Sequence, residues 1–178
     1  MNRASAILGL ICGATVLMGF FSPWLELNSR SYELGGARVK DHLTVSGWNL
    51  AQGKLDVLQT AESLEHMRWE KYKTIEIQVE RKFYPYLDLA GGILIVFGGI
   101  FLLMSKRRIP HLIVILGGVL AFVGGCLGFL DNRWIRYSTI IITENYAVFG
   151  YYGQGLLLCV IGSFILMAGW VIVWSAKQ

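Results

Sequence analysis

The stretch LDLAGGILIVFGGIFLLMSKRRIPHLIVILGGVLAFVGGCLGFL, residues Leu87–Leu130, sets the architecture of this chain. It consists of two apolar runs that are separated by the short basic turn Ser105–Pro110. Each run is close to the roughly 20 residues that a helix needs to cross a bilayer. The stretch therefore predicts two membrane-spanning helices joined by a tight turn, with Pro110 suited to the first turn of the second helix.

Two further apolar runs of this length lie at about Ala4–Phe21 and Leu156–Val173. The chain is 54% hydrophobic with a mean hydropathy of +0.52, which is too apolar for a soluble domain of 178 residues. We therefore predict a single membrane domain with four spans. Their expected ranges are about 4–23, 86–104, 111–130 and 153–174, and the loops between them are 24–85 and 131–152.

The distribution of charge predicts how the chain is oriented. The two chain ends and the turn between the middle spans contain no acidic residue, and together they hold Arg3, Lys106, Arg107, Arg108 and Lys177. By the positive-inside rule, both termini and this turn are cytoplasmic and the two loops face outward, most simply in a plasma (cytoplasmic) membrane. Each loop is electrically neutral, so the net charge of +4 reflects topology and does not indicate nucleic-acid binding.

The first outer loop has the patterns of regular secondary structure. Leu25–Leu27 and Arg38–Val45 alternate loosely, as half-buried strands do, around the turn Gly35-Gly36. From Lys54 to about Tyr72 the apolar residues recur every three to four positions, which predicts a short amphipathic helix. The clean alternation of Thr74–Glu80 then predicts another strand.

The second outer loop contains the β-branched run Thr139–Glu144, which lies 65 positions after Thr74–Glu80 and predicts a matching strand. Each loop would then end in a strand, an aromatic belt and a descending helix, as in two hairpins of one plan. Because unpaired strand edges are a liability, we expect strands from both loops to share one sheet. The predicted fold class is a four-transmembrane-helix bundle with a small extracytoplasmic antiparallel β-sheet.

Glycine doublets recur at a spacing of seven residues in the two middle spans. Since seven residues make about two helical turns, each pair of doublets forms a stripe of small residues, which allows close helix packing in lipid. We favour packing between the helices of this chain, and the alternative is that one stripe contacts a partner protein. The doublets of this candidate packing interface are Gly91 and Gly92, Gly98 and Gly99, Gly117 and Gly118, and Gly124 and Gly125.

Asp88 is the one acidic residue well inside a span, and such a residue is a functional hypothesis by default. It lies about one turn below the start of its span, where a carboxylate can cap the exposed helix amides. We favour this structural cap over an ion or substrate contact. Gln154, near the outer end of the fourth span, is a candidate partner for Asp88.

The sequence offers little for metal, haem or thiol chemistry. No two histidines have helical spacing within the spans, and only Asp41 with His42, or Glu62 with His66, approaches a metal-ligand pattern. The three cysteines lie inside spans and form no CxxC motif, so we expect them to act as small hydrophobic residues. We expect no catalytic residue, no metal site and no cofactor.

Trp24 and the pair Gly47-Trp48 lie in the first loop at places that resemble the loop signature of the claudin-like four-span superfamily. That superfamily includes the claudins, peripheral myelin protein relatives and calcium-channel gamma subunits. The family motif has a leucine between the glycine and the second tryptophan, followed by two disulfide-bonded cysteines, and this chain lacks all three. The resemblance implies a compact bundle whose outer sheet makes lateral and head-on protein contacts, and not the paracellular barrier role.

These patterns favour a non-catalytic membrane subunit that packs against other integral membrane proteins, in a larger complex or as a homo-oligomer, and presents its sheet for protein contacts. One alternative is a small transporter or channel subunit that uses Asp88. Another is an accessory subunit lining a quinone, pigment or metal site of a membrane enzyme. Neither a nucleophile elbow nor a phosphate-binding loop appears in the outer loops.

Overall fold

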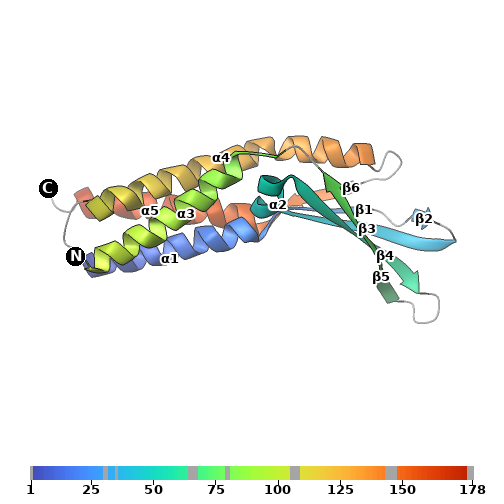
Figure 1. Cartoon of the computed structure of the whole chain (residues 1–178), viewed down its shortest axis with the longest axis horizontal. Helices are drawn as coiled ribbons and strands as arrows, with labels where there is room; N and C mark the ends of the chain where they lie inside the picture. The colour runs from blue at the N-terminus through green and yellow to red at the C-terminus, as the bar shows by residue number, and fades with distance from the viewer. Residues whose placement is uncertain are drawn as a thin grey trace.

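Figure 1 shows the computed structural model, in which a bundle of long helices is joined end to end to a twisted sheet. The structure describes residues 2–29, 32–34, 36–63, 68–78, 81–104, 109–142 and 148–175. Four of its described helices are long and apolar enough to cross a membrane, so the four predicted spans are confirmed as helices of that length and composition. They are α1 (Asn2–Phe21), α3 (Tyr84–Met104), α4 (Ile109–Ile142) and α5 (Gln154–Ser175).

The four long helices form a closed ring of neighbours. Helix α1 contacts α3 and α5, and α4 contacts the same two helices from the other side. The start of α1 and the end of α5 lie together at the end of the bundle away from the sheet (Figure 1). Both chain ends are therefore on one side of the bundle, as an even number of spans requires.

The sheet contains six strands, and every pairing in it is antiparallel. Along its main path the order is β5-β4-β3-β1-β6, and β2 pairs with β3 beside this path. The strands are β1 (Pro23–Ser29), β2 (Tyr32–Leu34), β3 (Ala37–Ser46), β4 (Lys54–Ser63), β5 (Arg68–Gln78) and β6 (Val148–Tyr152). Since β6 comes from the second loop and pairs with β1, the prediction of one antiparallel sheet built from both loops is confirmed.

The predicted amphipathic helix from Lys54 to Tyr72 is wrong. This segment forms β4 and the first part of β5, which pair with each other, while β4 also pairs with β3. The register places Leu55 opposite Ile77 and Val57 opposite Ile75, so apolar residues stand opposite one another across the pair. Pairing with neighbouring strands therefore stabilises a strand in this segment more than the spacing of its few apolar residues stabilises a helix.

The predicted strand Thr139–Glu144 is also wrong. Helix α4 continues without a break to Ile142, and the strand of the second loop lies later, at β6. Between Phe129 and Gly150 the sequence has no glycine or proline to stop a helix that is already formed, and propagation is favourable once a helix exists. The proposed 65-residue repeat is not reproduced, because Thr74 lies in a strand and Thr139 in a helix.

A short helix, α2 (Gly47–Gln52), interrupts the strands where the sheet meets the bundle. Ser46 and Asn49 form a capping box at its start, with the Ser46 hydroxyl accepting from the Asn49 amide at 3.2 Å. Gly53 ends the helix in the left-handed conformation with a φ of 71°, which costs glycine little. Helix α2 thus has a defined start and end despite its length.

Candidate functional site at the junction of bundle and sheet

The glycine doublets of α3 divide their contacts between two neighbouring helices. A Cβ added at Gly91 would lie 2.6 Å from the backbone nitrogen of Ala121 in α4, whereas one at Gly92 would lie 2.7 Å from Leu17 in α1. The second doublet repeats this division, with Val114 nearest to Gly98 and Leu10 nearest to Gly99. Because successive residues are about 100° apart around a helix, one doublet serves two interfaces.

The doublets of α4 follow the same rule. A Cβ at Gly117 would lie 2.8 Å from the carbonyl oxygen of Gly91 in α3, while the atom nearest to one at Gly118 belongs to Leu166 of α5. Gly124 faces Asp88 of α3, and Gly125 faces Val160 of α5. The structure thus places all eight glycines of the predicted packing interface at contacts within this chain.

The side chain of Asp88 is completely buried between α3 and α4. Its Oδ2 atom would be 2.6 Å from a Cβ at Gly124, and its Oδ1 atom 3.7 Å from one at Gly125. Neither carboxyl oxygen makes a hydrogen bond of good geometry with a described residue, and the thiol of Cys159 in α5 lies close to the carboxyl group. The predicted cap on the amides of the helix start is therefore wrong, and Gln154, which is exposed at the start of α5, is not hydrogen bonded to Asp88.

An aromatic layer closes the bundle on the sheet side of Asp88. Trp24 of β1 is completely buried and stacks on Tyr84, one turn before Asp88, with ring centroids 6.2 Å apart and an interplanar angle of 15°. Its indole N–H donates to the carbonyl oxygen of Gly19 at 3.0 Å. Gly128 of α4 lies against the other part of the ring, since a Cβ there would be 2.7 Å from Trp24.

The residues of the predicted loop signature meet at this layer. Gly47 lies against Trp24, because a Cβ at Gly47 would come within 2.9 Å of the indole and within 2.8 Å of Phe20. Trp48 is 43% exposed, and its ring centroid lies 6.4 Å from that of Phe20 and 6.1 Å from that of Phe21. The first tryptophan is therefore a core residue, and the second is an exposed aromatic at the level where α1 ends.

Two hydrogen bonds join α2 to the first turn of α3 and to the residues just before it. The hydroxyl of Tyr86 donates to the carbonyl oxygen of Ala51 at 2.9 Å, and the amide of Lys82 donates to the carbonyl oxygen of Leu50 at 3.1 Å. Gly153 adds a bond on the other side, from its amide to the carbonyl oxygen of Trp24 at 2.8 Å. The sheet is thus attached to the bundle at several points around its base.

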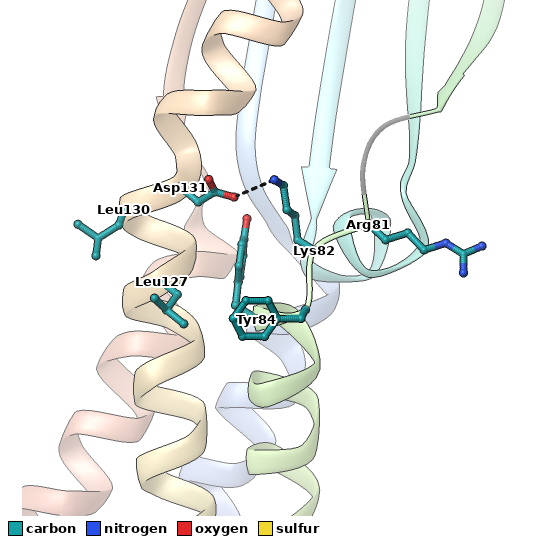
Figure 2. Close-up of a pocket in the computed structure, with 7 residues that line it drawn as sticks. Arg81, Lys82, Tyr84, Leu127, Leu130 and Asp131 are labelled. Atoms are coloured by element: carbon teal, nitrogen blue, oxygen red, sulfur yellow. Dashed lines mark ion pairs between the residues drawn. The ribbon is translucent and has the colours of Figure 1, made fainter.

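A cavity of about 510 Å³ opens between the start of α3 and the middle of α4. Figure 2 shows Lys82 directed at Asp131, with 3.8 Å between Nζ and Oδ2, and the hydroxyl of Tyr84 pointing toward the same carboxylate. The guanidinium of Arg81 points away from this pair (Figure 2). The residues lining the cavity are Arg81, Lys82, Phe83, Tyr84, Leu127, Leu130 and Asp131.

Metal-binding chemistry finds no support in the described part of the chain, where no three His, Cys, Asp or Glu residues come close enough to hold an ion. The candidate ligand His42 is instead hydrogen bonded through Nδ1 to the Asn28 side chain. The other candidate, His66, lies outside the described residues. The cysteines are free thiols, with Cys12 and Cys159 buried between helices.

Sequence reasoning missed the cluster of Lys82, Tyr84 and Asp131. Tyr84 precedes Asp88 by four residues, so the helical spacing alone places both on one face of α3. Asp131 marks the end of the apolar part of α4, and its contact with Lys82 depends on the pairing of two helices, which no local pattern reveals.

Comparison with protein-family models and with curated proteins gives no match to this chain.

Proposed function

We propose that this chain is a non-catalytic membrane assembly subunit. The bundle sits in the membrane, and the sheet provides contacts for a partner protein on its side of the membrane. The observation that carries this proposal is the sheet itself, which projects from the end of the bundle and is fixed there by Trp24, α2 and Gly153 (Figure 1).

The edge strand β5 is the part of the sheet best suited to a partner. Within the described sheet it pairs with β4 alone, over ten register positions of its 11 residues. An edge strand of this length presents a row of backbone donors and acceptors that can pair with another chain. Its sequence RWEKYKTIEIQ carries charges of both signs, which oppose indiscriminate pairing and favour a complementary partner.

The bundle can offer a lateral contact through its apolar outer surface. Because the glycine doublets are used within the chain, a lateral contact would use larger side chains such as Phe97 and Phe101, which are 55% and 48% exposed on one face of α3. These residues suit lipid as well as another helix. We therefore place the lateral contact second to the contact through the sheet.

The claudin-like resemblance supports this proposal at the level of plan. The first loop holds strands with one short helix, the second loop adds one strand, and the signature residues Trp24 and Gly47 lie in contact. We propose a distant relationship of this kind, with the termini in the cytoplasm and the sheet outside a plasma membrane.

Photocrosslinking in the source membrane tests the proposal. Benzoylphenylalanine is introduced at Glu70 and at Lys71, two neighbouring positions of β5, and then at Phe101 of α3. Ile95, which is completely buried in the bundle, is the matched control. We expect a crosslink to a second protein from β5 and none from Ile95, together with a stoichiometric complex in native mass spectrometry of the mildly solubilised membrane.

Different results would change the assignment. A crosslinked mass of two copies would identify the partner as another molecule of this chain. A lone monomer with no crosslink from β5 or Phe101 would overturn the assembly role.

The buried carboxyl group of Asp88 supports a second candidate, a small transporter or channel subunit. An acidic side chain without a described hydrogen-bond partner inside a bundle is expensive, and such residues often mark ion pathways. Asp88→Asn separates the two functions. A transporter should lose cation flux in proteoliposomes, whereas an assembly subunit should show no flux in either form and should still form its complex.

A further inference from the structure

The cavity between α3 and α4 lies at the edge of the apolar part of the bundle. Phe83 immediately precedes the apolar segment that begins at Tyr84, and Leu130 immediately precedes Asp131, where the apolar segment of α4 ends. Phe83 and Leu130 are 69% and 71% exposed, and both line the cavity. The apolar wall of the cavity is thus continuous with the part of the surface that faces lipid hydrocarbon.

The other wall of the cavity is polar and carries a net positive charge. Arg81 and Lys82 contribute two positive charges and Asp131 one negative charge, which leaves a formal charge of +1 among the lining residues. The Tyr84 hydroxyl, on a residue that is 4% exposed, points toward the Asp131 carboxylate. Lys82 and Asp131 form an ion pair in which the Asp131 side chain is the more exposed, at 31% against 16%, so the net positive charge of the lining comes from the exposed Arg81.

We propose that this cavity binds one anionic phospholipid from the leaflet on the sheet side. The phosphate of its headgroup contacts Lys82 and draws in the long, exposed side chain of Arg81. One acyl chain lies along Phe83, Leu127 and Leu130. A volume of about 510 Å³ is within the range of pockets that enclose small ligands, and the combination of a cationic rim with a hydrocarbon wall matches an amphiphile.

This inference goes beyond the assembly role and does not depend on it. The lipid would brace the junction, because Lys82 also donates its amide to α2 and Asp131 belongs to α4. A bound headgroup therefore connects the base of the sheet to two helices of the bundle.

Native mass spectrometry of the full-length, delipidated protein tests the proposal. The protein is titrated with phosphatidylglycerol or with phosphatidylcholine that carries the same acyl chains, and the bound fraction gives an apparent Kd for each. We expect tighter binding of phosphatidylglycerol. Arg81→Gln should weaken that binding about fivefold, since a basic residue near a membrane surface contributes about that factor toward anionic lipid.

Asp131→Asn should have the opposite effect and tighten phosphatidylglycerol binding about fivefold, because it raises the formal charge of the cavity from +1 to +2. A purely structural role for Asp131 would not produce that gain. Arg38→Gln is the matched control, since it removes the same charge from an exposed residue on β3 near the β2–β3 turn, and it should leave the Kd unchanged. Leu130→Asn should weaken the binding of both lipids.

Equal affinity for the two lipids would overturn the proposal, as would an Arg81→Gln effect no larger than that of Arg38→Gln. Unchanged binding in Leu130→Asn would indicate a site for the headgroup anion alone and would overturn the assignment to a lipid. If Asp131→Asn does not fold, Arg81→Gln still decides the matter, because no ion pair of Arg81 is present among the described residues.

Discussion

The Oδ2 atom of Asp88 lies directly against Gly124, at a place where a Cβ on residue 124 would come within 2.6 Å of it. The same Cβ would lie 2.9 Å from the Asp88 amide nitrogen and 2.9 Å from the carbonyl oxygen of Tyr84. Glycine at 124 therefore leaves room for both a carboxylate and a turn of backbone. Asp88 of α3 and Gly124 of α4 thus form one close contact between the two helices.

Gly124→Ala is expected to destabilise the bundle by roughly 1–3 kcal/mol, because the added methyl group meets backbone atoms that cannot rotate away. Gly9→Ala is the matched control, since the nearest atom to its Cβ would be 3.7 Å away and alanine is the better helix former. Unfolding of both variants in detergent by added SDS measures the difference. Equal midpoints would show that the contact between Asp88 and Gly124 is not tight.

The two tryptophans of the loop signature should differ in their contribution to stability. Trp24→Ala removes a completely buried ring, its stacking on Tyr84 and its hydrogen bond to Gly19, and should cost roughly 3–5 kcal/mol. Trp48→Ala removes a half-exposed ring and should cost less than about 1 kcal/mol. Thermal unfolding monitored by circular dichroism compares them, and a larger loss for Trp48 would contradict the placement of these rings.

Two neighbouring tyrosines give a similarly matched pair. Tyr86→Phe removes the hydrogen bond to the Ala51 carbonyl and should cost about 1 kcal/mol, with faster hydrogen exchange of the α2 amides. Tyr84→Phe removes a buried hydroxyl that points toward the Asp131 carboxylate without a well-formed hydrogen bond, and should therefore cost less than Tyr86→Phe. A costly Tyr84→Phe variant with a neutral Tyr86→Phe variant would reverse the roles that the structure gives them.

The predicted orientation is tested by thiol labelling of intact cells. Arg38→Cys places a thiol on the sheet, and Arg3→Cys places one near the start of α1, where both native side chains are exposed. By the positive-inside rule, a membrane-impermeant maleimide should label residue 38 at once and residue 3 only after permeabilisation. The wild-type chain is the control for its three native cysteines, and labelling in the reverse order would invert the topology.

The spans could be predicted from the sequence because a run of about 20 apolar residues permits few other structures in a membrane protein. Strands β1 and β3 were also predicted, from the alternation of their residues, whereas the short strand β2 between them was not. The spacing of the glycine doublets predicted stripes of small residues, but it left open whether these pack within the chain or against a partner. What the spacing could not show was that the two members of a doublet face different helices, since that depends on how all four helices are arranged.

The errors share a physical origin in long-range pairing. The segment after Lys54 has a spacing compatible with a helix, and its strand conformation follows from pairing with β3 and β5. The run beginning at Thr139 has β-branched residues, yet it continues a helix that began 30 residues earlier, at Ile109. The site at Lys82 and Asp131 was missed for the same reason, because two segments far apart in the sequence create it.

Helix α4 is one unbroken rod of 34 residues, about 51 Å long at 1.5 Å per residue, and it reaches past the ends of the other three helices (Figure 1). Its apolar part, Ile109–Asp131, is long enough to cross a bilayer, in which a helix adapts to the membrane thickness by tilting. A tilt of this straight helix would therefore displace its end at Ile142 farther sideways than its apolar segment.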